Sequence, residues 1–390
     1  RMASIVETET AEHLTVGTHV HTVEFALSLD EVIDFDVILN PTAMDGGLVH
    51  PGAPTQMVSG TFKPIEPTQA VEYYDPLHVV GTQRLGITPT VGAIHRVTAV
   101  MGAPDTDSWQ RVQSATATIQ APGITQTLTS RPVDHPGRHP VYAAHIELEE
   151  SGPVVMEQRF SLLLRNQRVS ATRLREATWA QVDALKGLPI LAWYLKPETI
   201  IQSDHPVVRD FVVNAIGADY RDKLTPYDAA RQLFKAVLAH VTYTYPDDGE
   251  PDLRGHNAVD MIKGRRGDCG GFSLLLVALF RHIGIPARTA CGAWVGTDVG
   301  HCWSEMFLPG AGWVLSDGSA GNGQSEDGRY AFFFGVMNNL NIRMAVKLCA
   351  VSPAGLPARS SSMLAFSSAS AGARAPMVLD RFAKMGHKTR

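Results

Sequence analysis

Hydrophobic and polar residues alternate in short runs over residues 14–165, and helical periodicity is absent from this part of the chain. The runs are rich in Val, Thr, Ile and Phe, and clusters of Pro, Gly and Asp separate them, which is typical of antiparallel strands joined by turns. We therefore expect residues 1–165 to form a β-rich, sandwich-like domain. Its clearest strands are predicted at 14–29, 57–62, 94–101, 114–119 and 154–164.

Helical spacing begins after about residue 200. Apolar residues recur every three or four positions over 206–216, which predicts a helix with Ser203 or Asp204 as its N-cap. A second helix is expected at Thr225 and Pro226, because an N-cap followed by proline is a common helix start. Both segments depart from the strand pattern that precedes them.

A third helix is predicted from Cys269 to Ile283, a segment that is apolar nearly all round and must therefore be buried. Gly284 is expected to end it, since glycine favours the position just after a helix. Strand patterns follow, which makes residues 166–350 an α+β domain. These strands are predicted at 287–295, 301–308 and 313–317, with a Pro-Gly-Ala-Gly turn between the last two.

The last part of the chain, 351–390, differs in composition. Ser, Ala, Gly and Pro dominate it, and residues 374–390 carry five basic residues against one acid. We expect a flexible basic tail here.

Charge and cysteine content narrow the function classes. The 34 Lys and Arg residues face 39 Asp and Glu residues, a net charge of −5, which does not favour nucleic acid or an anionic membrane as a partner. No apolar run approaches the ~18 residues of a membrane span. Four cysteines without a CxxC pair predict a reducing compartment rather than a disulfide framework. The first residues lack signal-peptide features, so a cytoplasmic location is expected, although a removed leader is compatible with Arg1 preceding Met2.

Cys269 is the first candidate for chemistry, because it lies at the first turn of the predicted buried helix. The free N–H groups and the positive end of the helix dipole there favour an anion. They can lower a cysteine pKa from about 8.5 into the range ~3.5–7.5, and they can hold an oxyanion. Gly270 and Gly271 would keep bulk away from the sulfur. The alternative is that Cys269 is one more small buried residue.

His301 and Asp317 are the candidate partners of this thiol. His301 follows Cys269 by 32 residues, and Asp317 follows by another 16, across the predicted turn. Because side chains alternate along a strand, His301 shares a face with Trp303 and Glu305. If the hairpin register aligns the faces, Asp317 reaches the imidazole and fixes its tautomer. The sequence does not determine that register, and a lone strand histidine is usually structural.

These residues together resemble the core of the transglutaminase-like superfamily, a papain-like Cys-His-Asp fold in which a central helix packs on an antiparallel sheet. The resemblance covers about 226–348, roughly a third of the chain. It rests on Val241-Thr242-Tyr243-Thr244-Tyr245, Gly267-Asp268-Cys269, Arg281-His282-Ile283-Gly284-Ile285-Pro286-Ala287-Arg288, His301-x-Trp303-x-Glu305, and Leu308-Pro309-Gly310-x-Gly312-Trp313-Val314 with Ser316-Asp317.

The resemblance implies roles for the three candidates. Cys269 would be the nucleophile, His301 the general acid and base, and Asp317 the residue that orients the imidazole. Tyr245 and Gly270 would lie on the substrate or oxyanion side of the site. Trp303 would pack against the hairpin, although a core aromatic is an equally good interpretation, and Glu305 is expected to be a structural partner of Arg288 rather than a catalytic acid.

The sequence also departs from the family pattern. Gly270 and Gly271 stand where many relatives have a bulky aromatic, and Gly318 stands where proline is usual. The first departure weakens an inference of glutamine-specific cross-linking. No carboxylate cluster resembles the calcium sites of animal transglutaminases, so no metal or other cofactor is predicted.

The expected function is therefore that of a thiol enzyme acting on an amide, ester or thioester carbonyl. Hydrolysis of a peptide or amide bond is favoured, with transfer of the acyl group to an amine as the alternative. A scaffold without turnover is the third possibility, but it predicts loss of one of the three residues, and all are present. The partner would be a peptide, protein or acyl-donor substrate, bound in part by the β domain, and the oligomeric state is left open.

Overall fold

The structure is a computed structural model, and it describes residues 33–39, 56–62, 69–89, 96–132, 140–148, 152–244, 253–294, 300–322, 334–335, 341–345, 364–369 and 377–387. The predicted strand at 14–29 and the candidate Tyr245 lie outside these residues.

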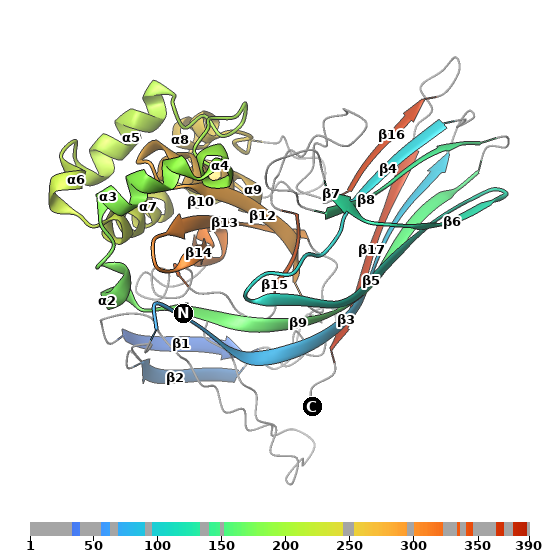
Figure 1. Cartoon of the computed structure of the whole chain (residues 1–390), viewed down its shortest axis with the longest axis horizontal. Coiled ribbons are helices and arrows are strands. Elements are labelled where there is room, and N and C mark those ends of the chain that lie inside the picture. The colour runs from blue at the N-terminus through green and yellow to red at the C-terminus, as the bar shows by residue number, and fades with distance from the viewer. Residues whose placement is uncertain are drawn as a thin grey trace, which may run out of the picture.

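A sandwich of two antiparallel sheets dominates the first half of the chain (Figure 1). One sheet has the strand order β17-β3-β9-β5-β6 and the other β16-β4-β8-β7, while β1 (Ile33–Leu39) and β2 (Gln56–Phe62) form a separate antiparallel pair. Buried residues such as Met101, Ile119 and Met156 fill the space between the two larger sheets. Their strands are β3 (Val71–Pro89), β4 (Arg96–Gly102), β5 (Gln110–Ala121), β6 (Ile124–Leu128), β7 (Arg131–Pro132), β8 (Pro140–Glu147), β9 (Val154–Val169), β16 (Leu364–Ala369) and β17 (Met377–His387).

The C-terminal segment contributes two of these strands, which corrects the expectation of a flexible tail. β16 pairs with β4, and β17 pairs with β3. The apolar runs in these strands are short, and serine, alanine and glycine surround them. The edge strand of a sheet has unpaired backbone N–H and C=O groups, and another strand can pair with them through its own backbone. This pairing depends little on side chains, so composition did not predict it.

Helices form one layer of the second half, and α9 (Cys269–His282) is its buried centre. Twelve of its residues are buried, as its continuous apolar character predicts. Gly284 follows it with a φ of 92°, the left-handed conformation that favours glycine. The other helical elements are α2 (Ala171–Leu174), α3 (Trp179–Ala184), η1 (Leu185–Gly187), α4 (Pro189–Trp193), α5 (Pro206–Ile216), α6 (Tyr220–Lys223), α7 (Pro226–His240), α8 (Ala258–Gly264) and α10 (Gly318–Asn322).

The N-terminal residues of two helices test the capping predictions. Thr225 caps α7 and accepts a hydrogen bond from the Asp228 N–H, with Pro226 at the first helical position, as predicted. The N-cap of α5 is His205, and this differs from the prediction of Ser203 or Asp204. The imidazole Nδ1 of His205 accepts the Val207 N–H at 3.1 Å, a role that is not evident from a histidine in the sequence.

A four-stranded antiparallel sheet, called here the core sheet, packs against α9 and has the order β14-β13-β12-β15. Its strands are β12 (Ala287–Trp294), β13 (Gly300–Leu308), β14 (Gly312–Ser316) and β15 (Asn341–Ala345). A short parallel pair, β10 (Thr242–Tyr243) and β11 (Arg266–Gly267), lies just before α9. A Cβ on Gly292 would lie 1.6 Å from the carbonyl oxygen of Ile342, so glycine is required where β15 approaches β12.

The core sheet is buried on both faces. Cys291, Cys302 and Met306 face the apolar core around α9. Trp303 and Leu315, on the other face, pack with Phe160, Leu162 and Leu164 of β9, as well as Val79 of β3 and Trp109. Figure 1 shows β3 and β9 passing along this sheet before they enter the sandwich. β9 thus runs through the expected domain boundary at 165 and belongs to both halves of the protein.

Candidate active site

The first turn of α9 carries Cys269, and the chain holds this turn firmly. Asp268 is the N-cap and accepts the Gly271 N–H at 3.0 Å, while its other oxygen pairs with Arg254 at 2.7 Å. A Cβ on Gly271 would lie 2.5 Å from the sulfur of Met261 in α8 and 3.1 Å from the Gly255 carbonyl oxygen. Gly271 therefore serves the packing of α8 on α9, a reason that differs from the open acyl site expected from the sequence.

The hairpin of β13 and β14 brings His301 and Asp317 together. Glu305 pairs with Leu315 and Phe307 with Trp313, so the two predicted faces coincide in this register. His301 Nε2 lies 2.5 Å from Asp317 Oδ2. The other oxygen, Asp317 Oδ1, accepts hydrogen bonds from the Ser319 hydroxyl at 2.9 Å and the Ala320 N–H at 3.0 Å. The carboxylate is thus held in place at the start of α10.

Charge stabilises the imidazolium form of His301. Burial by itself lowers the pKa of this histidine, but the Asp317 carboxylate and its hydrogen bond outweigh burial and raise the pKa to about 10. Burial would raise the pKa of Asp317, and the attraction of His301 together with the donors at Oδ1 lowers it instead. With Nε2 facing Asp317, Nδ1 is the nitrogen left for the thiol, and the imidazole is hydrogen-bonded with Cys269.

The Cys269 thiol has a second neighbour that the sequence analysis did not assign to the site. It is hydrogen-bonded with the thiol of Cys302, which in turn lies 2.9 Å from the Cys291 sulfur. The contact with Cys302 and burial both raise the pKa of Cys269, and His301 opposes them. This corrects the expectation of a lowered pKa, because the neighbouring thiol and burial together outweigh the opposing effect of His301. The adjacency of Cys302 to His301 is the sequence signal that could have indicated this contact.

The remaining candidates occupy supporting positions. Trp303 is buried, and its ring lies nearly parallel to that of His301, with 6.1 Å between the centroids and 30° between the planes. Gly270 is buried, and its carbonyl accepts a hydrogen bond from the Ser273 hydroxyl. Glu305 pairs with Arg288 through contacts of 2.6 Å, so its predicted structural role is confirmed. Gly318 lies against Phe272 of α9, where a Cβ would come within 3.0 Å of that ring.

Two further findings concern metal ions and membranes. In the part of the chain that the structure describes, no group of three or more His, Cys, Asp or Glu side chains is arranged to hold a metal ion. Among the helices of the same residues, none combines the length and apolar character needed to cross a bilayer.

Removal of the Cys302 thiol is expected to make Cys269 more reactive. In Cys302→Ala the main cause of the raised Cys269 pKa is lost, so the thiolate forms at lower pH. If the pKa of Cys269 falls by about one unit, the thiolate fraction at pH 7.5 rises about tenfold. Alkylation by iodoacetamide should then accelerate by the same factor. Alkylation rates measured from pH 6 to 10 by intact mass test this, with Cys291→Ala as the control. An unchanged profile in Cys302→Ala would show that the contact has no electrostatic effect.

Comparison with known proteins shows what the segment that carries this site is similar to. The sequence profile of the transglutaminase-like superfamily matches residues 214–318, which include Cys269, His301 and Asp317. A proposed cysteine protease from Cytophaga hutchinsonii has a similar fold, with a TM-score of 0.57 at 13% identity over 82% of this chain and 93% of that chain. No curated protein sequence matches the chain.

A second solved structure is much less similar as a whole. The periplasmic domain of TgpA from Pseudomonas aeruginosa, bound to ethylmercury, has a TM-score of 0.26 at 14% identity over 60% of this chain and 89% of that chain. The Cytophaga structure therefore supports the fold, and the profile match supports the family. Residues 214–318 of this chain are thus similar in sequence to the core of the transglutaminase-like superfamily.

Proposed function

We propose that the protein is a thiol enzyme that forms an acyl-enzyme on Cys269 and hydrolyses a peptide or amide bond. The observation that carries the proposal is the shared imidazole of His301, which contacts the Cys269 thiol on one side and lies 2.5 Å from Asp317 on the other. This arrangement can move a proton between a nucleophile and a leaving group. The match of residues 214–318 to the transglutaminase-like superfamily supports the proposal.

Each of the three side chains has a distinct role in the proposed reaction. The neutral His301 imidazole takes the proton of the Cys269 thiol, and the thiolate so formed attacks the carbonyl carbon. The resulting imidazolium donates this proton to the leaving amine as the carbon–nitrogen bond breaks. The neutral imidazole then takes a proton from water, and the resulting hydroxide attacks the thioester and releases Cys269. Asp317 stays ionised throughout, holds the imidazole in place and stabilises its positive charge.

The start of α9 offers donors for the oxyanion that forms in each step. Helix geometry leaves the N–H groups of Cys269 and Gly270 without acceptors inside the helix. The N–H groups of Gly271 and Phe272 are already used by the side chain and the carbonyl of Asp268. We therefore propose the Cys269 and Gly270 N–H groups as the oxyanion donors, and Tyr245 stays a prediction from the sequence.

Acyl transfer to an amine is the competing reaction, and one experiment distinguishes the two. The protein is incubated with peptide, ester and thioester acyl donors, with and without an added primary amine, and analysed by intact-mass spectrometry. We expect an adduct on Cys269 that is lost to water at the same rate with the amine present. Passage of the acyl group to the amine would identify an acyltransferase. If no donor forms an adduct, the enzyme proposal is contradicted and a scaffold role is favoured.

A further inference from the structure

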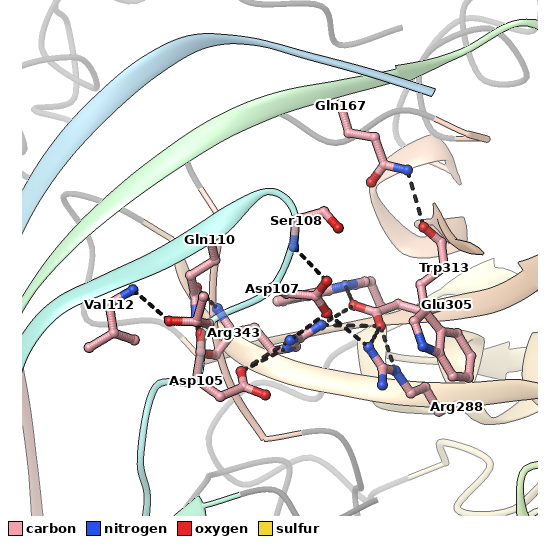
Figure 2. Close-up of polar contacts among 12 residues, drawn as sticks. Asp105, Asp107, Ser108, Gln110, Val112, Gln167, Arg288, Glu305, Trp313 and Arg343 are labelled. Carbon is pink, nitrogen blue, oxygen red and sulfur yellow. Dashed lines mark hydrogen bonds and ion pairs between the residues drawn. The ribbon is translucent and has the colours of Figure 1, made fainter. Parts of the chain in front are cut away.

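A buried ionic cluster joins the sandwich to the core sheet (Figure 2). It consists of Arg288 on β12, Glu305 on β13, Arg343 on β15, and Asp105 and Asp107 from the β4–β5 loop, which spans residues 103–109. The side chains of Arg343 and Glu305 are 1% and 0% exposed. Residues from three core strands and from one sandwich loop thus share a single site, in which the two aspartates of the loop stay partly exposed, at 25% and 22%.

Asp107 is the member that bridges the two arginines. Its Oδ2 lies 2.8 Å from Arg343 and 3.3 Å from Arg288. Burial raises the pKa of Asp107, but both guanidinium groups and the Ser108 N–H outweigh this and lower it, so the carboxylate is ionised. Asp105 adds a second contact to Arg343 at 3.1 Å. Without the loop, two buried guanidinium groups would face Glu305 alone, an arrangement that buried charges do not tolerate well.

The cluster continues toward His301 through Trp303. Glu305 Oε1, which contacts Arg343 at 3.3 Å, accepts the Trp303 indole N–H at 3.2 Å. The Trp303 ring in turn neighbours the His301 imidazole, with 6.1 Å between the ring centroids. Trp109, the last residue of the loop, contacts Trp303 edge-on with 6.2 Å between ring centroids. The loop therefore holds Trp303 in two ways. Its aspartates pair with the arginines that hold Glu305, the acceptor of the Trp303 N–H, and Trp109 packs directly on the Trp303 ring.

The residue that follows the loop, Gln110, is anchored to the core sheet by its side chain, which contacts the backbone of Arg343. Gln110 accepts the Arg343 N–H with its Oε1 at 2.8 Å and donates its Nε2–H to the Arg343 carbonyl at 2.9 Å. These paired hydrogen bonds link β5 of the sandwich to β15, and Gln110 is fully buried. Movement of the loop away from the sheet would break both bonds together with the ion pairs.

We infer that the β4–β5 loop is part of the catalytic machinery, with Asp107 and Trp109 as positioning residues that hold His301 in place through Glu305 and Trp303. The catalytic part of this inference rests on the proposed function. Both aspartates, Trp109 and Arg343 lie outside the segment 214–318 that matches the family profile. The sandwich would then be required for the reaction itself, and not only for binding a large substrate.

The test compares Asp107→Asn with Glu72→Gln in the full chain. Glu72 forms an ion pair of similar burial with Arg168 at 2.6 Å between β3 and β9, two strands that contribute no member of the ionic cluster. Small misplacements at an active site are costly, so Asp107→Asn should lower kcat roughly 10- to 100-fold with little change in KM. Alkylation of Cys269 should move to higher pH, because a displaced His301 no longer lowers the pKa of the thiol. Glu72→Gln should change neither.

Further variants keep the test informative if Asp107→Asn folds poorly. Asp107→Glu restores the charge and should recover most of the activity, and Trp109→Phe, which keeps the packing partly, should show an intermediate loss. If Asp107→Asn lowers Tm while kcat and the alkylation profile match the wild type, the loop is structural and the inference fails. The alkylation profile needs no substrate, so it tests the positioning role of the loop even if the wild type has no turnover. Absence of turnover in the wild type would contradict the proposed function and not the role of the loop.

Discussion

Cys269→Ala is expected to reduce turnover to the background rate, a loss on the order of 10⁶-fold for an enzyme that depends on a covalent nucleophile. The fold should be nearly unchanged. Cys269 is the first residue of α9, its N-cap Asp268 remains, and alanine is a good helix former. A shift in Tm within about 3 °C is expected. Turnover of the acyl donors that acylate the wild type is the measurement.

A matched control is provided by Cys291→Ala. Cys291 is also a free thiol on the α9 side of the core sheet, but it is separated from Cys269 by Cys302. This variant should keep the wild-type rate and the acyl adduct on Cys269. If Cys269→Ala retained substantial turnover, or if the adduct formed on another residue, Cys269 would not be the nucleophile.

Asp317→Asn is expected to lower the rate roughly 10³-fold through the wrong tautomer of His301. The Ser319 hydroxyl and the Ala320 N–H both donate to Asp317 Oδ1, so the amide oxygen of asparagine would stay with these donors. Its N–H₂ group would then face His301 Nε2 and force that nitrogen to accept a hydrogen bond. In the neutral imidazole, Nδ1 would carry the proton and could not take one from Cys269.

The pH dependence of the same variant provides a second measurement. In the wild type the imidazolium persists to a pKa of about 10, so the neutral imidazole that takes the Cys269 proton becomes abundant only near that pH, and the rate should rise toward it. Removal of the Asp317 charge leaves burial as the main influence, and burial lowers the pKa of His301. The ascending limb of the pH–rate profile should therefore move to lower pH in Asp317→Asn. The surface variant Asp183→Asn serves as control, and an unmoved limb would mean that another group sets the charge of His301.

The sequence was sufficient to predict the elements that carry the site, because their signals are local. The continuous apolar run after Cys269 and the glycine at 284 define α9, and the Pro-Gly turn defines the β13–β14 hairpin. The sequence left the register of the hairpin undetermined, and the proximity of His301 and Asp317 depends on that register. In the structure Glu305 pairs with Leu315, which defines it.

Features that depend on contacts between distant segments could not be predicted. Asp107 and Arg288 are 181 residues apart, and Asp105 and Arg343 are 238 apart, so each reads as an ordinary solvated residue in the sequence. The raised pKa of Cys269 has the same origin, because it requires β13 to present Cys302 to the start of α9. Likewise, the sequence suggests that Gly271 leaves room for a substrate, whereas in the structure the space beside it is filled by Met261 of the neighbouring helix.

The pairing of β17 with β3 has a consequence for how the protein is made. Residues 377–387 pair with residues 79–89, so this edge of the sandwich is completed only after the whole segment between them has been synthesised. Contacts between such distant segments form slowly, since a very long loop must close first. During synthesis the entire segment 214–318 emerges while the edge of β3 is still unpaired. Exposed sheet edges attract other chains, so the nascent protein passes through a stage at which a chaperone would be of most use.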